Sequence, residues 1–330
     1  SKHDARLMRQ CGLIVLLFLL IPHPSSLIPG SAALAADYPS RPVRVLIPFT
    51  PGSAADIIAR AMEPAMRDRL GQPFVIDNRG GAGGNIAAEM TAKATPDGYT
   101  IMMATIGTHA INYSLYSKLS FHPQRDFTPV GLVGESPNAL VINPKVQANS
   151  IQELIALAKS KPGGLNYGTS GAGTTVHLSA ELFSVMTGIK MIHVPHKGAA
   201  EALTSLLGGQ TDLMFASLSS AIPLIKAGRL RAFAVTGAQR SPSIPELPTV
   251  AEAANLPGYA ASAWFGIVGP AHMPANAVAT LSKTALSSLE DAEVRKRLFN
   301  AGVEIRTSSP EEFARYIESE MQKWAKVVKA

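Results

Sequence analysis

The chain has 330 residues, of which 46% are hydrophobic and 16% are charged, and its formal net charge is +6. This length predicts two domains with a large apolar core and excludes a wholly disordered chain. The basic residues are scattered, and no Lys/Arg cluster alternates with aromatic residues, so nucleic-acid binding is not expected.

The first 35 residues have the pattern of a secretory signal peptide. Lys2, Arg6 and Arg9 form a basic start, residues 12–21 are apolar, and Ala-Leu-Ala at 33–35 resembles a cleavage site. Prolines interrupt this run before it reaches the roughly 20 apolar residues that a membrane-spanning helix needs. The alternative to a cleaved signal peptide is an uncleaved membrane anchor. We therefore expect a periplasmic protein that begins near residue 36.

The mature chain would carry a net charge of +4, from 27 basic and 23 acidic residues, because three basic residues and one acidic residue precede residue 36. The chain's one cysteine, Cys11, also lies in that segment. The mature protein would then have no thiol, which excludes disulfides, thiolate metal sites and cysteine catalysis.

From residue 41 onward, short apolar runs alternate with amphipathic stretches, which is typical of an α/β fold with parallel sheets. In the first part of the chain we expect strands at 43–47, 74–76 and 100–103 and helices at 56–62 and 85–94.

Residues 138–143 are expected to be the first crossover into a second α/β unit. There the pattern predicts strands at 165–167, 189–194, 211–215 and 230–235, and helices at 176–186, 199–207 and 221–227, with a further helix that Ser150 and Glu153 open as a capping box.

The chain then returns to the first unit. Residues 240–259 are Pro-rich and loop-like, 264–268 resemble a returning strand, and Ser309 and Glu312 cap a long C-terminal helix. Two crossings predict two α/β lobes, 38–138 with 259–330 and 139–258, joined by a hinge around a ligand cleft.

The loop at residues 49–56 joins the first strand to its helix, where open α/β folds bind ligands. Its Pro-Gly turn could leave the amides of Ser53, Ala54 and Ala55 pointing outward from the helix N-terminus, which favours an anion. The alternative is that Ser53 and Asp56 only form a capping box.

Residues 168–175, Gly-Thr-Ser-Gly-Ala-Gly-Thr-Thr, hold the equivalent place in the second unit. The glycines allow close backbone approach and the hydroxyls can bind a polar group, so an anion cradle is favoured over a plain turn. The spacing fits neither a phosphate loop nor the nucleophile elbow of a serine hydrolase. Two such loops facing one cleft predict a small, negatively charged ligand.

The remaining motifs are less specific. Gly-Gly-Ala-Gly-Gly at 80–84 lacks the spacing of a dinucleotide-binding loop and is interpreted as a turn before a helix. His193 and His196 flank Val-Pro and are interpreted as part of a loop, with a metal site as the alternative. His177 could donate to a ligand carboxylate or simply start its helix, and His109 could line the cleft.

Several stretches closely resemble the solute-binding receptors of tripartite tricarboxylate transporters, the Bug family. The matching segments cover the mature chain in order and are 38–44, Pro51-Gly52 with Asp56, 78–85, 96–99, 168–171, 193–195 with Lys197-Gly198, and 207–210.

The resemblance implies a type II periplasmic-binding fold that closes on a small organic carboxylate and delivers it to a membrane permease. It also implies a monomer with no cofactor, no metal and no enzymatic activity, in which the two loops hold the carboxylate. The residues expected at the ligand are Phe49, Pro51, Gly52, Ser53, Ala54, Asp56, Ile106, Gly107, Thr108, His109, Tyr167, Thr169, Ser170, Gly171, Gly173, Thr174, His177, Ala216 and Ser217.

The sequence departs from the family pattern at four positions. Ser53 and Ala54 replace a usual Gly and a further small or hydroxyl residue, and His196 stands where Tyr is frequent. Ala216 replaces a frequent Asp, whose loss would disfavour an amino-acid ligand. A ligand-sensing subunit of a signalling partner, or a secreted serine hydrolase that uses Ser170 and His177, are the alternative functions.

Overall fold

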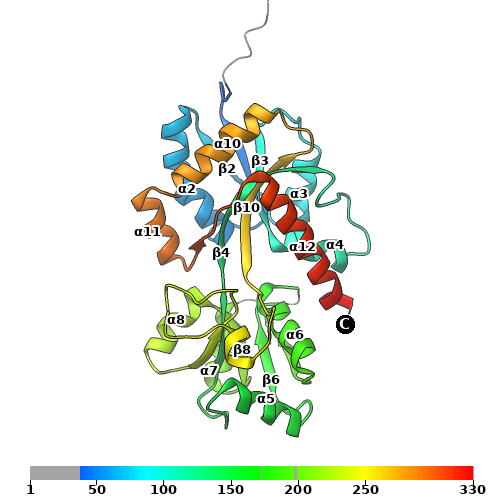
Figure 1. Ribbon diagram of the computed structural model, residues 1–330, viewed down its shortest axis with the longest axis vertical. Helices are drawn as coiled ribbons and strands as arrows, with labels where there is room; N and C mark the ends of the chain where they lie inside the picture. Colours follow the sequence, from blue (N-terminus) through cyan, green and yellow to red (C-terminus); the bar gives the residue numbers. More distant parts are fainter. Residues whose placement is uncertain (1–37, 172, 197–198, 330) are drawn as a thin grey trace, which may run out of the picture. The chain divides into compact units, whose positions relative to one another are not determined.

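The computed structural model describes residues 38–171, 173–196 and 199–329. The expected signal peptide and Cys11 lie outside these residues, as do Ala172, Lys197 and Gly198. Within these ranges, no helix has the length and apolar character to cross a membrane. Tyr38–Ala330 forms one contact unit that contains two β-sheets (Figure 1).

The first sheet has six strands in the order β11-β4-β10-β3-β1-β2. Its strands are β1 (Val43–Ile47), β2 (Phe74–Asn78), β3 (Thr100–Thr105), β4 (Phe127–Ser136), β10 (Ala263–Pro270) and β11 (Glu304–Ile305). β1 pairs in parallel with β2 and β3, whereas β10 pairs antiparallel with β3 and β4. The expected parallel sheet is therefore wrong at β10, because that strand re-enters the sheet from the end at which β4 leaves it.

Helices cover both faces of this first sheet (Figure 1). They are α2 (Ala54–Leu70), α3 (Asn85–Ala92), α4 (Asn112–Leu115), α10 (Ala275–Ser288), α11 (Ala292–Asn300) and α12 (Pro310–Lys329), with the single 3-10 turn η1 (Ala82–Gly84) and the short π-helix η2 (Gly107–Ile111). The turn predicted at 80–84 is confirmed.

The C-terminal helix α12 begins with the predicted capping box. Ser309 Oγ accepts a hydrogen bond from the Glu312 amide at 3.1 Å, and the Glu312 carboxylate accepts one from the Ser309 amide at 2.8 Å. Phe313 then packs so closely on β10 that a Cβ at Gly266 would lie 2.2 Å from its ring. Only glycine allows this helix to lie against the strand.

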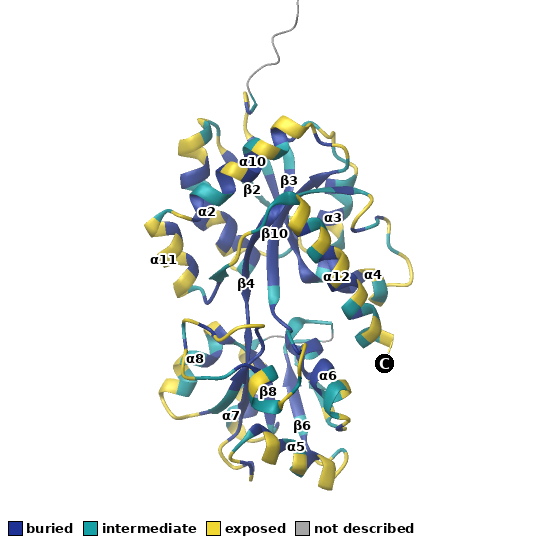
Figure 2. Ribbon diagram, viewed as in Figure 1, coloured by how far each residue is buried: buried dark blue, intermediate teal, exposed yellow. Residues whose placement is uncertain are grey.

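The second sheet has five strands in the order β7-β6-β8-β5-β9. Its strands are β5 (Asn138–Ile142), β6 (Asn166–Thr169), β7 (Ile192–Pro195), β8 (Leu213–Ser217) and β9 (Arg231–Val235). Its helices are α5 (Ile151–Ser160), α6 (Thr175–Thr187), α7 (Ala199–Gly208), α8 (Leu218–Lys226) and α9 (Val250–Ala254). Buried residues follow the strands of both sheets, and exposed residues lie on the outer helix faces (Figure 2).

Three local predictions are corrected here. Residues 138–142 are not the crossover but strand β5, and the chain crosses between the sheets at Pro137. β5 pairs antiparallel with β8 and β9, so the expected parallel sheet is wrong there as well. His193 lies in strand β7 rather than in a loop, and residues 240–259 contain the short helix α9. The Ser150 hydroxyl caps α5, but the Glu153 carboxylate binds the Asn149 amide instead of closing the box.

The fold is the two-lobed α/β type that the pattern predicts, with the mixed sheets described above. The strands of the first sheet fall within 43–136 and 263–305, and those of the second fall within 138–235. The lobe boundaries at 138 and 258 stay a prediction.

Candidate functional site

A cavity of about 390 Å³ lies at the carboxyl ends of strands from both sheets. Phe49 follows β1, Thr105 ends β3, Ser170 follows β6, and Ser217 ends β8. This is where open α/β sheets bind ligands, because loops and helix N-termini converge there. A larger groove of about 890 Å³ between α10 and α12 is open and is lined by none of the predicted ligand-binding residues, so the smaller cavity is the candidate site.

Eight of the predicted ligand-binding residues line the cavity. They are Phe49, Ala54, Ile106, Gly107, Ser170, Gly173, Thr174 and Ser217.

The other predicted residues lie behind this lining or beside it. They are Pro51, Gly52, Ser53, Asp56, Thr108, His109, Tyr167, Thr169, Gly171, His177 and Ala216. Ala216 is fully buried in the core that Val141 and Met214 share, so its side chain does not face the cavity.

Sequence reasoning missed most of the cavity wall. The additional lining residues are Ala55, Gly83, Thr105, Ile111, Asn112, Leu115, Tyr116, Ser136, Asn138, Thr175, Val176, Ala199, Ala263, Trp264 and Phe265. Two of these positions carried a signal, since Ala55 and Thr175 lie within the predicted loops at 49–56 and 168–175, and the Ala55 amide was expected to point outward. The others come from elements that only the tertiary fold brings together.

Helix α2 directs its first amides to the cavity. Ser53 caps the helix through its hydroxyl, which accepts from the Asp56 amide at 3.3 Å. The Ser53 amide itself donates to the Thr50 carbonyl at 3.2 Å, so the prediction that it points outward is wrong. In the described chain, no group accepts a hydrogen bond from the amides of Ala54 and Ala55, which both line the cavity.

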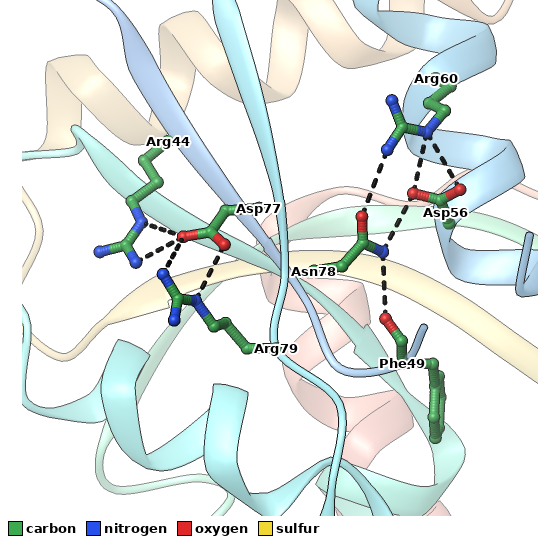
Figure 3. A network of polar contacts seen from close by, with 7 residues as sticks. All are labelled: Arg44, Phe49, Asp56, Arg60, Asp77, Asn78 and Arg79. Atoms are coloured by element: carbon green, nitrogen blue, oxygen red, sulfur yellow. Dashed lines mark hydrogen bonds and ion pairs between the residues drawn. The ribbon is translucent and has the colours of Figure 1, made fainter. Parts of the chain in front are cut away.

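Asp56 organises the loop behind these amides (Figure 3). Its carboxylate accepts from the Gly52 amide at 2.9 Å, from Arg60 Nε at 3.0 Å to each oxygen, and from Asn78 Nδ2 at 3.1 Å. Asn78 Nδ2 also donates to the Phe49 carbonyl at 3.0 Å. Asp56 is only 3% exposed, and it fixes the loop from behind rather than lining the cavity.

The pKa of Asp56 lies below its ordinary value. Burial alone would raise this pKa, but the hydrogen bonds from Arg60, Gly52 and Asn78 and the Arg60 charge together lower it. Asp56 is therefore an anion at neutral pH.

Helix α6 approaches the cavity from the other sheet in the same way. Thr174 caps it, accepting from the His177 amide at 3.3 Å and donating to the Gly171 carbonyl at 2.8 Å. The next two amides, those of Thr175 and Val176, find no acceptor among residues that the structure describes. Gly173 has a φ of 76° and lies against Leu115, so this loop reaches across to α4.

A stack of aromatic rings supports the second loop from behind. His177 stacks on His193 with ring centroids 4.2 Å apart, and the Tyr167 ring stacks near both, 5.0 Å from His193 and 6.3 Å from His177. His193 Nε2 lies 2.7 Å from Thr169 Oγ1, and Tyr167 donates to the Glu181 carboxylate. His177 thus orients the loop from outside the cavity lining.

His109 is fully buried beside the first lobe's core and does not line the cavity. Its Nδ1 lies 2.9 Å from Thr108 Oγ1, its ring meets Phe127 edge to face, and within the described ranges its Nε2 has no partner. Burial lowers the pKa of His109 to about 3, so the ring is neutral.

The described lining contains no Lys, Arg, Asp, Glu or His side chain. Its walls are largely apolar, with Ile111, Leu115 and Phe265 among them. Trp264 also lines the cavity, and its Nε1 donates at 3.2 Å to Glu320, which is not a lining residue. An anion in this cavity would meet helix N-termini and neutral donors rather than a buried cation.

Among the described residues, Ser170 and His177, the pair of the alternative hydrolase, are not hydrogen-bonded to each other. In the described chain, Ser170 Oγ donates to Thr174 Oγ1 at 3.5 Å, and His177 Nδ1 is occupied by the Gly173 amide, so no base is poised on the serine. No group of three or more His, Cys, Asp or Glu side chains that could hold a metal occurs in the parts of the chain that the structure describes.

Comparisons with known proteins agree with this geometry. Residues 58–330 match the family model of the tripartite tricarboxylate transporter family receptor. Protein BugT of Bordetella pertussis is 34% identical over 301 residues, which cover 91% of this chain and 92% of BugT.

Solved structures are also similar. R. palustris Rpa4515 with adipate has 40% identity and a TM-score of 0.76, with 89% of this chain and 98% of that chain covered. MatC from Rhodopseudomonas palustris with bound malate has 33% identity and a TM-score of 0.73, with 88% and 100% covered. The chain belongs to the tripartite tricarboxylate transporter family of receptors.

Proposed function

We propose that this chain is an exported solute-binding receptor that captures a small organic carboxylate in the cavity and delivers it, chemically unchanged, to a membrane permease. It acts in the periplasm as a monomer, without cofactor or metal. Ligand contacts both lobes and therefore favours a closed arrangement.

The observation that carries this proposal is the convergence of two helix N-termini on one cavity. The amides of Ala54 and Ala55 on α2, and those of Thr175 and Val176 on α6, have no acceptor among the described residues. The two helices follow strands of different sheets. Each helix end carries a partial positive charge and unpaired donors, so the pair suits a carboxylate. The apolar walls would cover the carbon skeleton of the ligand.

The relatives support the carboxylate class, since one similar solved structure is that of a protein with adipate and another that of a protein with bound malate. Aspartate and glutamate should bind worse than succinate, because no acidic side chain in the described lining would receive their ammonium group.

The test is a thermal-shift screen of residues 36–330 with adipate, malate, succinate, citrate, benzoate, aspartate and glucose. A carboxylate at 100 times its Kd should stabilise the fold by about 2.7 kcal/mol. Recovery of the ligand intact after prolonged incubation supports a receptor, whereas turnover would indicate an enzyme. Stabilisation by glucose with no response to any carboxylate would refute the proposal.

Closure and delivery need separate measurements. Small-angle scattering should show contraction at saturating ligand, and an unchanged profile would count against closure. Cells that lack the gene should lose uptake of the bound carboxylate, and normal uptake would contradict a transport role.

A further inference from the structure

The anion-binding end of α2 already carries an anion. Asp56 is the third residue of the helix, and its carboxylate is ionised and nearly inaccessible to solvent. A carboxylate at this position stabilises the helix end, but it would repel a second carboxylate that approaches the amides of Ala54 and Ala55. An anion site beside Asp56 therefore requires a compensating positive charge.

Arg60 supplies that charge from one helical turn further along (Figure 3). Its Nε lies 3.0 Å from both Asp56 oxygens, and its Nη2 donates to Asn78 Oδ1 at 3.2 Å. The Arg60 side chain is 53% exposed and does not line the cavity. It therefore acts on Asp56 without reaching the ligand.

The other acidic side chain near Asp56 forms its own ion pairs. Asp77, next to Asn78 on β2, is paired with Arg44 at 2.5 Å and with Arg79 at 2.8 Å (Figure 3). Among the described residues, Arg60 is the cation that pairs with Asp56. Removal of the Arg60 charge would thus leave the buried Asp56 charge uncompensated at the helix end.

We infer that Arg60 is a positioning residue that sets the affinity of the cavity for anions by neutralising Asp56. The inference rests on the proposed carboxylate site. It separates two functions of the Asp56 side chain, because its oxygens shape the loop through Gly52 and Asn78 while its charge opposes the ligand.

The experiment measures Kd by calorimetry with adipate, or with malate if wild type does not bind adipate, at low and high salt. Arg60→Gln keeps hydrogen-bonding capacity but removes the charge, and Arg60→Lys keeps the charge. Asp56→Asn keeps an acceptor for Gly52 but removes the opposing charge, and the double variant removes both. Arg67→Gln is the matched control, because Arg67 is on the same helix and pairs with Glu63 four residues earlier.

Arg60→Gln should weaken binding by roughly twofold to thirtyfold at low salt, the range for one charge at a helix end, and the loss should shrink at high salt. Arg60→Lys should bind nearly as wild type, and the double variant should bind more tightly than Arg60→Gln, because it also removes the opposing charge. Asp56→Asn should bind more tightly than wild type. Arg67→Gln should change nothing. A purely structural role would give losses that are insensitive to salt and are not restored in the double variant.

Thermal melting of each variant checks that it folds. If Arg60→Gln does not fold, Asp56→Asn still decides the matter, and affinity that is unchanged or weaker in that variant would overturn the inference. The inference is also overturned if wild type binds adipate or malate and Arg60→Gln binds the same ligand equally well. Wild type that binds no carboxylate refutes the proposed function, and this inference falls with it.

Discussion

The amide of Gly173 donates a hydrogen bond to Nδ1 of His177 at 3.1 Å. Gly173 lines the cavity and His177 does not, so this bond connects the ligand-facing loop to the ring stack behind it. Nδ1 can accept only when it carries no proton. The bond therefore makes the shape of the second loop dependent on the protonation of His177.

Ligand affinity should fall in mild acid for this reason. Burial lowers the pKa of His177, although the Glu181 charge opposes this, and His193 and Tyr167 are the other titratable groups packed on the ring. Because the pKa of His177 in the folded protein lies below 6.5, its neutral ring contributes fully to the stability of the fold above pH 6.5. This contribution is lost as the pH falls from 6.5 toward the folded-state pKa.

Calorimetry with the bound carboxylate between pH 8 and pH 5.5 would show the loss. His177→Asn retains an acceptor that does not titrate in this range, so its affinity should depend less on pH. An equal pH dependence in the variant would assign the effect to another group.

Acid stability should depend on His109. Its pKa of about 3 lies far below 6.5, so its neutral form stabilises the fold above pH 6.5, and this stabilisation is lost progressively as pH falls from about 6.5 toward 3. His109→Asn should be less stable at pH 7, because it leaves space in the core, but its unfolding free energy should fall less steeply with acid. Urea unfolding at several pH values gives both quantities, and parallel pH curves would contradict the prediction.

The cap of α6 should affect binding as well as stability. Thr174→Ala removes the acceptor for the His177 amide and the donor to Gly171, which should cost about 1 kcal/mol and weaken ligand binding. Ser150→Ala removes the equivalent cap of α5, which lies away from the cavity lining, and is the matched control. It should lower stability by a similar amount and leave Kd unchanged. Equal effects of both variants on Kd would show that α6 acts only through global stability.

Tryptophan fluorescence should report on ligand binding. The chain has two tryptophans, and both donate to Glu320, but Trp264 lines the cavity and Trp324 does not. A bound carboxylate should change the emission of wild type and of Trp324→Phe, and it should leave Trp264→Phe nearly silent. A full signal in Trp264→Phe would place the ligand elsewhere.

Local patterns in the sequence predicted elements whose signals are local. The apolar run Val43–Ile47 is strand β1 at the predicted residues, and the Ser309 box opens α12. Strand β4 was not predicted, because Pro129, Gly131 and Gly134 interrupt its apolar pattern. Gly134 is needed there because a Cβ would lie 2.8 Å from the Glu304 carbonyl of β11, a contact that only the tertiary fold creates.

The site shows the same division. The two helix N-termini could be predicted because Gly, Ser and Thr mark loops that start helices. The wall of Asn112, Leu115 and Trp264 could not be predicted, since these residues lie on separate elements that meet only across the cavity. The direction of the Asp56 side chain depends on Asn78 and Arg60, which no pattern within its own loop reveals.

The central claim is that the cavity recognises a carboxylate by helix N-termini rather than by its apolar walls alone. The most direct test is calorimetric titration of the wild-type protein with adipate and with adipamide, which has the same carbon chain but no charge. We predict that if the dicarboxylate binds, the diamide binds at least tenfold more weakly, and malate with its neutral diamide serves as a second pair. Equal affinities within a pair that binds, or binding of the neutral compounds alone, would contradict the account.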